Sequence, residues 1–222
     1  MQIAIALFPG FEPLDAIGPY QVVTQLPDAE VVLCSGTTGI VRDHKGLLAI
    51  EVEHTYDDVA SPDIVIVPGG FGTRALAHPD SDLVSWVRGA HESTTFTTSV
   101  CTGSLVLGAA GLLDGLDATT HWMNYDELAA FGARPTERRV VHVGKIITAA
   151  GVSSGIDMAL YLVGLTHGDD VAEAVQLGIE YDPQPPYDAG APSKARPEIR
   201  ELVEAVISAS QPPSDAAATT SS

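Results

Sequence analysis

The most informative segment of the chain reads FTTSVCTGSL and spans residues 96–105. A β-rich run leads directly into Cys101, and a helical pattern with Gly and Ser begins immediately after it. We therefore expect a strand over Thr95–Val100 and a helix over about Thr102–Leu113. A tight strand-to-helix elbow strains the backbone of the residue at the turn and presents its side chain at the carboxyl edge of a sheet.

The elbow makes Cys101 a candidate nucleophile. The N-terminus of the following helix supplies a partial positive charge and free N–H groups, which favour the reactive thiolate. The alternative is that Cys101 is a small buried hydrophobic residue, as most free cysteines are. For Cys34, in the middle of the run Val31-Val32-Leu33-Cys34, that second interpretation is favoured. Two cysteines without zinc-type spacing predict neither a disulfide framework nor a metal site.

On either side of the elbow, apolar runs alternate with helical patterns, which predicts an α/β fold with a mostly parallel sheet flanked by helices. Two hairpins are expected, at Arg42–Val52 with its turn at residues 44–46, and at Val140–Ala149. The other predicted strands are Gln2–Leu7, Glu30–Cys34 and Ile64–Val67, and the other predicted helices before residue 150 are Ile17–Gln25 and Ser81–Glu92.

The C-terminal third is predicted to be helical, with helices at Gly155–Leu165, from Asp169 or Asp170 to about Glu180, and at Glu198–Ala209. Between the last two helices, residues 181–197 contain five prolines and predict an ordered excursion. We expect one domain over residues 1–210 and a disordered Pro/Ala/Ser/Thr-rich tail over residues 211–222.

The composition excludes some partners. With 11 Lys and Arg against 29 Asp and Glu, the formal charge is −18, so the chain should repel nucleic acid and anionic lipid. No apolar run approaches the roughly 20 residues of a membrane span. The first apolar run stops at Pro9-Gly10, too soon for a signal peptide, and we expect a cytoplasmic protein.

A glycine turn follows a predicted buried strand in the segment VIVPGGFG, residues 65–72. In an open α/β sheet this turn lies at the same edge as Cys101. The backbone N–H groups of Gly70 and Thr102 are then candidates for an anion hole.

Asp15 lies in the segment FEPLDAIGP, residues 11–19, and should open at the same edge. A carboxyl beside a thiolate repels its charge, so one of the two groups should hold a proton, and Asp15 becomes a candidate general acid or base. A helix cap is the equally supported alternative. His121, beside Trp122, is interpreted either as a packed residue or as a substrate contact.

Together these segments resemble the DJ-1/PfpI superfamily, from Gln2 to about Ile207. Within it, the chain is most similar to the branch that hydrates isonitriles. Thr102 follows the cysteine where peptidase-like and glyoxalase-like branches usually carry His, and Asp15 stands where they usually carry Glu. The segments that carry the likeness are LDAIGP (14–19), SVCTGSLVLGAAGLL (99–113), ATTHW (118–122), GVSSGID (151–157) and QLGIEYDPQPP (176–186).

The resemblance implies a flavodoxin-like, class I glutaminase-like single-domain sandwich that forms a homodimer. It also implies that Asp15, Cys101 and Thr102 are catalytic, with Gly70, Thr102 and His121 at the substrate. The expected reaction adds water to a small-molecule isonitrile through a thioimidate on Cys101, without metal or cofactor. The alternatives are a glyoxalase-type enzyme and a non-catalytic redox or ligand sensor.

Overall fold

The computed structural model describes residues 1–210, and the predicted disordered tail lies outside them. The chain forms two compact units, Met1–Asp182 and a second that begins at Pro183. The expected α/β domain thus has its sheet within the first 182 residues, and its extension to residue 210 stays a prediction.

The first unit is built on a seven-stranded sheet in the order β10-β11-β7-β6-β1-β2-β5. Every neighbouring pair is parallel except the hairpin β10–β11. The expected α/β class with a mostly parallel sheet is confirmed. The strands are β1 (Gln2–Ala6), β2 (Glu30–Ser35), β5 (His54–Thr55), β6 (Ile64–Val67), β7 (Phe96–Val100), β10 (Val140–Val143) and β11 (Ile146–Ala149).

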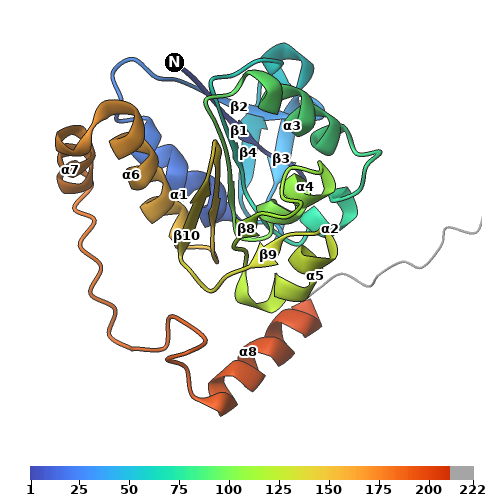
Figure 1. Cartoon of the computed structure of the whole chain (residues 1–222), viewed down its shortest axis with the longest axis vertical. Helices are drawn as coiled ribbons and strands as arrows, with labels where there is room; N and C mark the ends of the chain where they lie inside the picture. Colours follow the sequence, from blue (N-terminus) through green and yellow to red (C-terminus); the bar gives the residue numbers. More distant parts are fainter. Residues whose placement is uncertain (211–222) are drawn as a thin grey trace, which may run out of the picture. The chain divides into compact units, whose positions relative to one another are not determined.

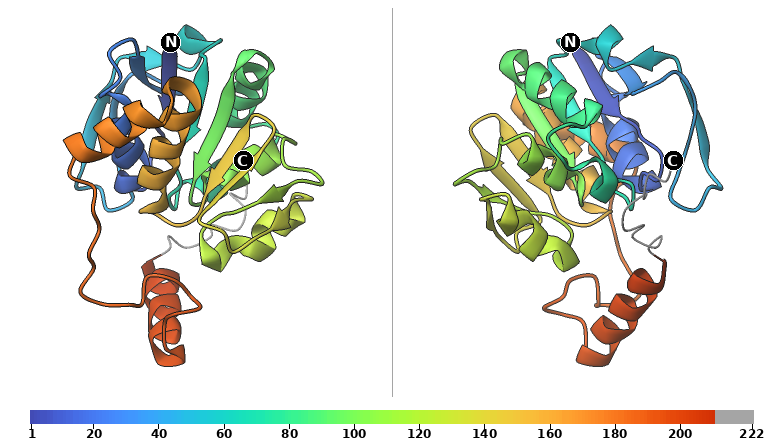
Figure 2. Two further views of the ribbon diagram at one scale, coloured as in Figure 1. Left: turned by 60° about the vertical axis from the view of Figure 1, so that its left-hand side comes forward. Right: turned by 90° about the vertical axis from the view of Figure 1, so that its right-hand side faces the viewer.

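Helices cover both faces of the sheet (Figures 1 and 2). The helices α1, α6 and α7 lie on one face, and α3 and α4 lie on the other. Their bounds are α1 (Pro13–Val23), α3 (Asp82–Ser93), α4 (Gly103–Ala109), α6 (Ser154–His167) and α7 (Asp169–Gly178). Shorter elements are α2 (Thr73–Leu76), α5 (Tyr125–Ala130), the 3-10 turns η1 (Asp57–Val59) and η2 (Trp122–Asn124), and the strand pairs β3–β4 (Gly39–Arg42, Ala49–Val52) and β8–β9 (Asp117–Ala118, Arg134–Pro135). The second unit contains α8 (Pro197–Ser210).

Three predicted boundaries are wrong. Helix α1 begins at Pro13, because proline fits the first turn of a helix. Helix α4 ends at Ala109, since Gly111 adopts a left-handed backbone with φ 78°. The first hairpin pairs residues 39–42 with 49–52, and its turn is longer than predicted because Asp43 accepts hydrogen bonds from the N–H groups of Leu47 (2.8 Å) and Leu48 (3.0 Å).

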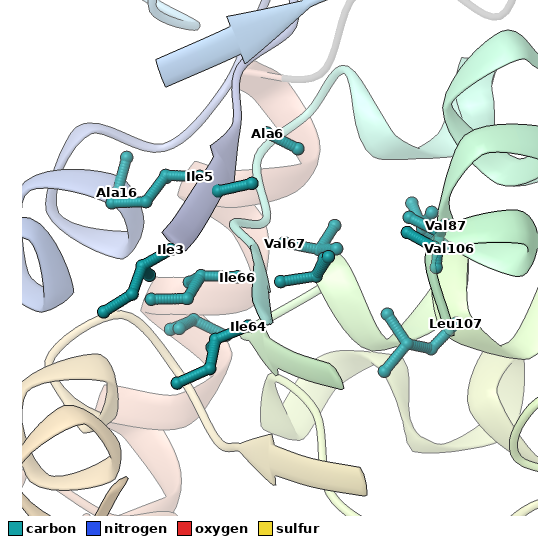
Figure 3. Close-up of a cluster of buried hydrophobic side chains, with 14 of the residues drawn as sticks. Ile3, Ile5, Ala6, Ala16, Ile64, Ile66, Val67, Val87, Val106 and Leu107 are labelled. Atoms are coloured by element: carbon teal, nitrogen blue, oxygen red, sulfur yellow. The ribbon is translucent and has the colours of Figure 1, made fainter. Parts of the chain in front are cut away.

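The central strands are buried on both faces, as in other parallel sheets. Side chains alternate across the sheet, so Ile3, Ile5, Ile64 and Ile66 point toward α1, while Val67 lies on the opposite face with Val87 and Val106 of α3 and α4 (Figure 3). All these side chains are fully buried. The core therefore holds the carboxyl ends of β1, β6 and β7 in fixed positions.

The elbow packs closely on β6. A Cβ atom at Gly103 would lie 2.1 Å from the carbonyl oxygen of Val67 and 2.8 Å from that of Pro68. Backbone atoms cannot yield as a flexible side chain can, so only glycine lets α4 start here.

We predict that Gly103→Ala lowers the free energy of unfolding by at least about 2 kcal/mol, because the strand and the elbow would have to separate. The matched control is Gly89→Ala in the exposed middle of α3, where a new Cβ meets nothing within 4 Å. That change should stabilise the chain by about 0.5–1 kcal/mol. Urea unfolding of both variants checks the pair, and equal effects of the two changes would contradict the packing described for the elbow.

Candidate active site

The predicted elbow is present, and Cys101 occupies it in a left-handed backbone conformation with φ 54°. Such a conformation costs a non-glycine residue about 1–3 kcal/mol and persists only where neighbouring contacts impose it. The Cys101 N–H donates to the carbonyls of Ala149 (3.0 Å) and Ala150 (2.9 Å). Its carbonyl accepts from the hydroxyls of Thr120 (3.0 Å) and Ser104 (3.1 Å). Four hydrogen bonds thus fix the strained residue, which is 6% exposed.

Asp15 lies in the first turn of α1 and is fully buried. Its Oδ2 accepts a hydrogen bond from the N–H of Gly69 at 2.8 Å, and Oδ1 is buried without a hydrogen-bond partner among residues 1–210. The carboxyl therefore binds the glycine turn after β6, and the helix-cap alternative is wrong. A neutral carboxyl in this setting carries its proton on Oδ1, since Oδ2 already accepts.

Burial raises the pKa of the Asp15 carboxyl well above its usual range. The hydrogen bond from Gly69 opposes this rise, as does the interaction with the Cys101 side chain, while the charge of Glu12 adds to it. Burial therefore favours the neutral form of Asp15 over the carboxylate.

Burial also raises the pKa of the Cys101 thiol well above its usual range, and the charge of Asp15 adds to that rise. Hydrogen bonds from the backbone N–H groups of Thr102 and Val152 lower it. The N–H groups at the elbow favour the thiolate, as expected, but burial is the larger effect. Two negative charges buried side by side repel each other, so ionisation of Asp15 opposes ionisation of the Cys101 thiol.

The hydroxyl of Thr102 is hydrogen-bonded away from the sulfur. Its Oγ1 accepts from the N–H of Gly70 (3.0 Å) and the hydroxyl of Thr73 (2.9 Å), and it lies 3.3 Å from the carbonyl oxygen of Gly70. The N–H of Gly70 is thus engaged by Thr102 in this structure, and its predicted role in an anion hole stays a prediction. The N–H groups directed at the sulfur belong to Thr102 and Val152.

Two residues at the site, Val152 and Thr73, are not singled out by the sequence. Val152 acts through its backbone, which leaves no mark on the side-chain pattern, although residues 151–157 lie between a strand and a helix at the correct edge of the sheet. Thr73 follows the glycine turn, is fully buried, and also donates to the Gly70 carbonyl at 2.6 Å. A buried threonine three residues after a glycine turn is too common to be singled out from sequence.

Gly69 allows these groups to meet. A Cβ atom there would lie 2.6 Å from both the N and Oγ1 of Thr102, and 2.8 Å from Oδ2 of Asp15. The side chains of Asp15 and Thr102 therefore converge on a position that only glycine can occupy.

His121 lies against the loop that carries Val152. A Cβ at Gly151 would lie 2.9 Å from Cδ2 of His121, and the ring accepts a hydrogen bond from the N–H of Met123 at 3.4 Å. Burial lowers the pKa of His121, which favours the neutral ring. These contacts place His121 beside the site and pack it in the η2 turn, so its predicted contact with substrate stays a prediction.

Other features of the described chain bear on the chemistry. Burial raises the pKa of Cys34 to about 12, in keeping with the interpretation of this residue as a buried hydrophobic one. Within residues 1–210, no group of three or more His, Cys, Asp or Glu side chains could hold a metal ion. The same residues contain no helix long and apolar enough to cross a membrane.

A doubly wound α/β sheet with a buried cysteine at a strand-to-helix elbow and a carboxyl beside it defines a known class of cysteine-bearing α/β proteins. The chain belongs to the DJ-1/PfpI family, which it matches over residues 1–165.

Among curated proteins, the chain is 43% identical to the isonitrile hydratase of Pseudomonas putida over 195 residues, which are 88% of this chain and 85% of that protein. It is 28% identical to the transcriptional regulator CdhR of Pseudomonas aeruginosa, over 76% of this chain and 52% of the regulator. The chain thus spans about half the length of the regulator but most of the hydratase.

Among solved structures, a ThiJ/PfpI family protein from Pseudomonas syringae superposes with a TM-score of 0.89 at 37% identity, over 95% of this chain and 87% of the other. The oxidised DJ-1 of Toxoplasma gondii superposes with a TM-score of 0.71 at 24% identity, over 82% of this chain and 99% of the other, and shows the shared fold.

We predict that Asp15→Asn raises the melting temperature near neutral pH by about 2–4 °C, the shift that about 1 kcal/mol produces in a chain of this size. Because the pKa of Asp15 is raised in the folded protein, its contribution to the free energy of unfolding is fully present at a pH below the pKa of an unfolded aspartate. That contribution is lost as the pH rises toward the folded pKa, and Asn does not undergo this loss. The melting temperatures of the wild-type protein and of Asp15→Asn, measured from acidic to alkaline pH, should therefore be equal in acid and differ at higher pH.

The matched control is Asp80→Asn, because Asp80 is exposed. That variant should follow the wild-type curve throughout. A less stable Asp15→Asn protein at neutral pH would show that Asp15 is an ordinary ionised carboxylate.

Proposed function

We propose that the chain is an isonitrile hydratase that converts R–N≡C and water into an N-substituted formamide. The observation that carries the proposal is the buried pair of Cys101 and Asp15, with Thr102 in place of a histidine after the cysteine. Cys101 has no imidazole base next to it, but a carboxyl that can give a proton lies beside it. This arrangement suits an isonitrile, because attack of sulfur on the isonitrile carbon must be accompanied by protonation. The 43% identity to the isonitrile hydratase of Pseudomonas putida supports the same substrate class.

Because burial raises the pKa of both groups, the pair of Cys101 and Asp15 first loses one proton to solvent, which leaves a thiolate beside a neutral carboxyl. The thiolate then adds to the terminal carbon of the isonitrile, and a C–S bond forms. Asp15 donates its proton to the same carbon, so the product is a neutral thioimidate, R–N=CH–S–Cys101, and a carboxylate. The geometry fits this role because Oδ1 of Asp15 is buried and has no hydrogen-bond partner among the described residues.

In the second step, water adds to the thioimidate carbon, with its proton passing to nitrogen by way of Asp15. The C–S bond of the tetrahedral intermediate then breaks, its hydroxyl proton returns to Asp15, and the formamide leaves. The thiolate and the neutral carboxyl are restored. The N–H groups of Thr102 and Val152 stabilise the sulfur anion at the start and the end of the cycle.

The direct test is incubation of the purified protein with cyclohexyl and aryl isonitriles, followed by measurement of formamide. Methylglyoxal serves as the comparison substrate, since a glyoxalase-type enzyme would form lactate from it. Lactate without formamide would overturn the proposal.

We predict that Cys101→Ser and Cys101→Ala abolish hydratase turnover while the protein stays folded. A serine hydroxyl has no base beside it and is not ionised, so it cannot replace a thiolate. Cys34→Ser is the control and should keep its activity, because Cys34 is buried in β2 and its thiol is directed to the carbonyl of Ile5 at 3.8 Å. Turnover near the wild-type level in either Cys101 variant would exclude this residue as the nucleophile.

We predict that Asp15→Asn lowers turnover by about 10²–10⁴-fold, the usual effect of losing a general acid–base group. Asparagine keeps the shape and accepts from Gly69, but it cannot exchange a proton. Asp15→Glu should be intermediate, because its carboxyl is displaced by one methylene. Unchanged turnover in Asp15→Asn would require another proton donor.

We also propose that the chain is a homodimer, as its resemblance to the DJ-1/PfpI superfamily implies. Sedimentation at micromolar concentration checks this, and the mass of a single 23.2 kDa chain would count against it.

A further inference from the structure

A polar cluster surrounds the start of helix α6, outside the catalytic pair. Asp157, in the first turn of α6, accepts from Arg139 through Oδ2 and from the hydroxyl of Tyr181 through Oδ1 at 2.9 Å. Arg139 also reaches Oγ of Ser153, the N-cap residue of α6, at 3.2 Å. One guanidinium thus binds two positions of the first turn of the helix, and the tyrosine fixes the second oxygen of the carboxylate.

The same arginine also holds the loop before the helix. The N–H of Ala150 donates to the carbonyl of Arg139 at 2.9 Å, and the carbonyl of Ala150 accepts from the N–H of Cys101 at the same distance. The loop between β11 and α6 is therefore tied to Cys101 on one side and to Arg139 on the other. Val152 lies in this loop, and its N–H is one of the two that are directed at the Cys101 sulfur.

We propose that Arg139, Asp157 and Tyr181 are positioning residues that hold the start of α6 so that the Val152 N–H stays directed at the Cys101 sulfur. The inference rests on the proposed function in taking Cys101 as the nucleophile. These side chains act through the backbone of the loop. The charges that act directly on the thiol are those of Asp15 and Glu12.

The sign of one effect separates positioning from simple electrostatics. Asp157→Asn removes a negative charge, and by Coulomb's law alone this would lower the pKa of a nearby thiol. Loss of the Val152 hydrogen bond raises that pKa. Tyr181→Phe changes no charge and removes only the hydroxyl, while Arg139→Lys keeps the charge but cannot bind Ser153 and Asp157 together.

The experiment uses the full chain in a Cys34→Ser background, so that iodoacetamide reports on Cys101 alone. The apparent thiol pKa is read from the pH dependence of alkylation, and kcat is measured with cyclohexyl isonitrile. We expect Tyr181→Phe, Asp157→Asn and Arg139→Lys each to raise the thiol pKa, by up to about one unit, and to lower kcat by up to about tenfold, the effect of one hydrogen bond to a charged group.

Matched controls are Asp117→Asn, in the exposed ion pair of Asp117 with Arg134, and Tyr187→Phe, at an exposed tyrosine. Both should leave the thiol pKa and kcat unchanged. A thiol pKa that stays the same in all three cluster variants, or falls in Asp157→Asn, would overturn the proposal. Alkylation does not require isonitrile turnover, so a chain that fails to hydrate isonitriles but shows these pKa shifts would refute the proposed function and leave the positioning role intact.

Discussion

A thiol and a carboxyl are buried together, and the cost of placing two charges side by side away from solvent governs the arrangement around them. Burial raises the pKa of both groups, so neither ionises easily and the pair exchanges a proton instead of losing two. The surrounding backbone compensates each anion separately. Gly69 donates to the carboxyl of Asp15, and the N–H groups of Thr102 and Val152 are directed at the sulfur. The chemistry proposed for the site uses this balance, since one group gives a proton as the other forms a bond.

The fold meets this constraint by bringing four chain segments to one edge of the sheet. Helix α1 supplies the carboxyl, the turn after β6 supplies Gly69, the elbow after β7 supplies the thiol, and the loop before α6 supplies Val152. The buried core of β1 and β6 fixes the first two segments, and four hydrogen bonds hold the strained backbone of Cys101. A rigid frame is needed here, because a small displacement would leave a buried charge without its donor.

The parts of this site that appear as side-chain patterns were predictable from the sequence. A β-rich run ending at Cys101 predicted the elbow, and an early acidic residue predicted a carboxyl at the same edge. The hydrogen bond from Gly70 to Thr102 and the action of the Val152 N–H on the sulfur were not predictable, because backbone hydrogen bonds depend on how loops meet in space. The burial that raises the pKa of the Cys101 thiol was not predictable either, since burial of a side chain at a turn is not visible in a local pattern.

The central claim is that burial favours the protonated form of Asp15 beside the thiol of Cys101. Infrared difference spectroscopy between the wild-type protein and Asp15→Asn tests it directly, because a neutral carboxyl and a carboxylate absorb in separate regions. At neutral pH the account predicts the carbonyl stretch of a neutral, buried carboxylic acid, shifted in Cys101→Ala because its neighbour is gone. A difference spectrum with carboxylate bands alone would contradict it.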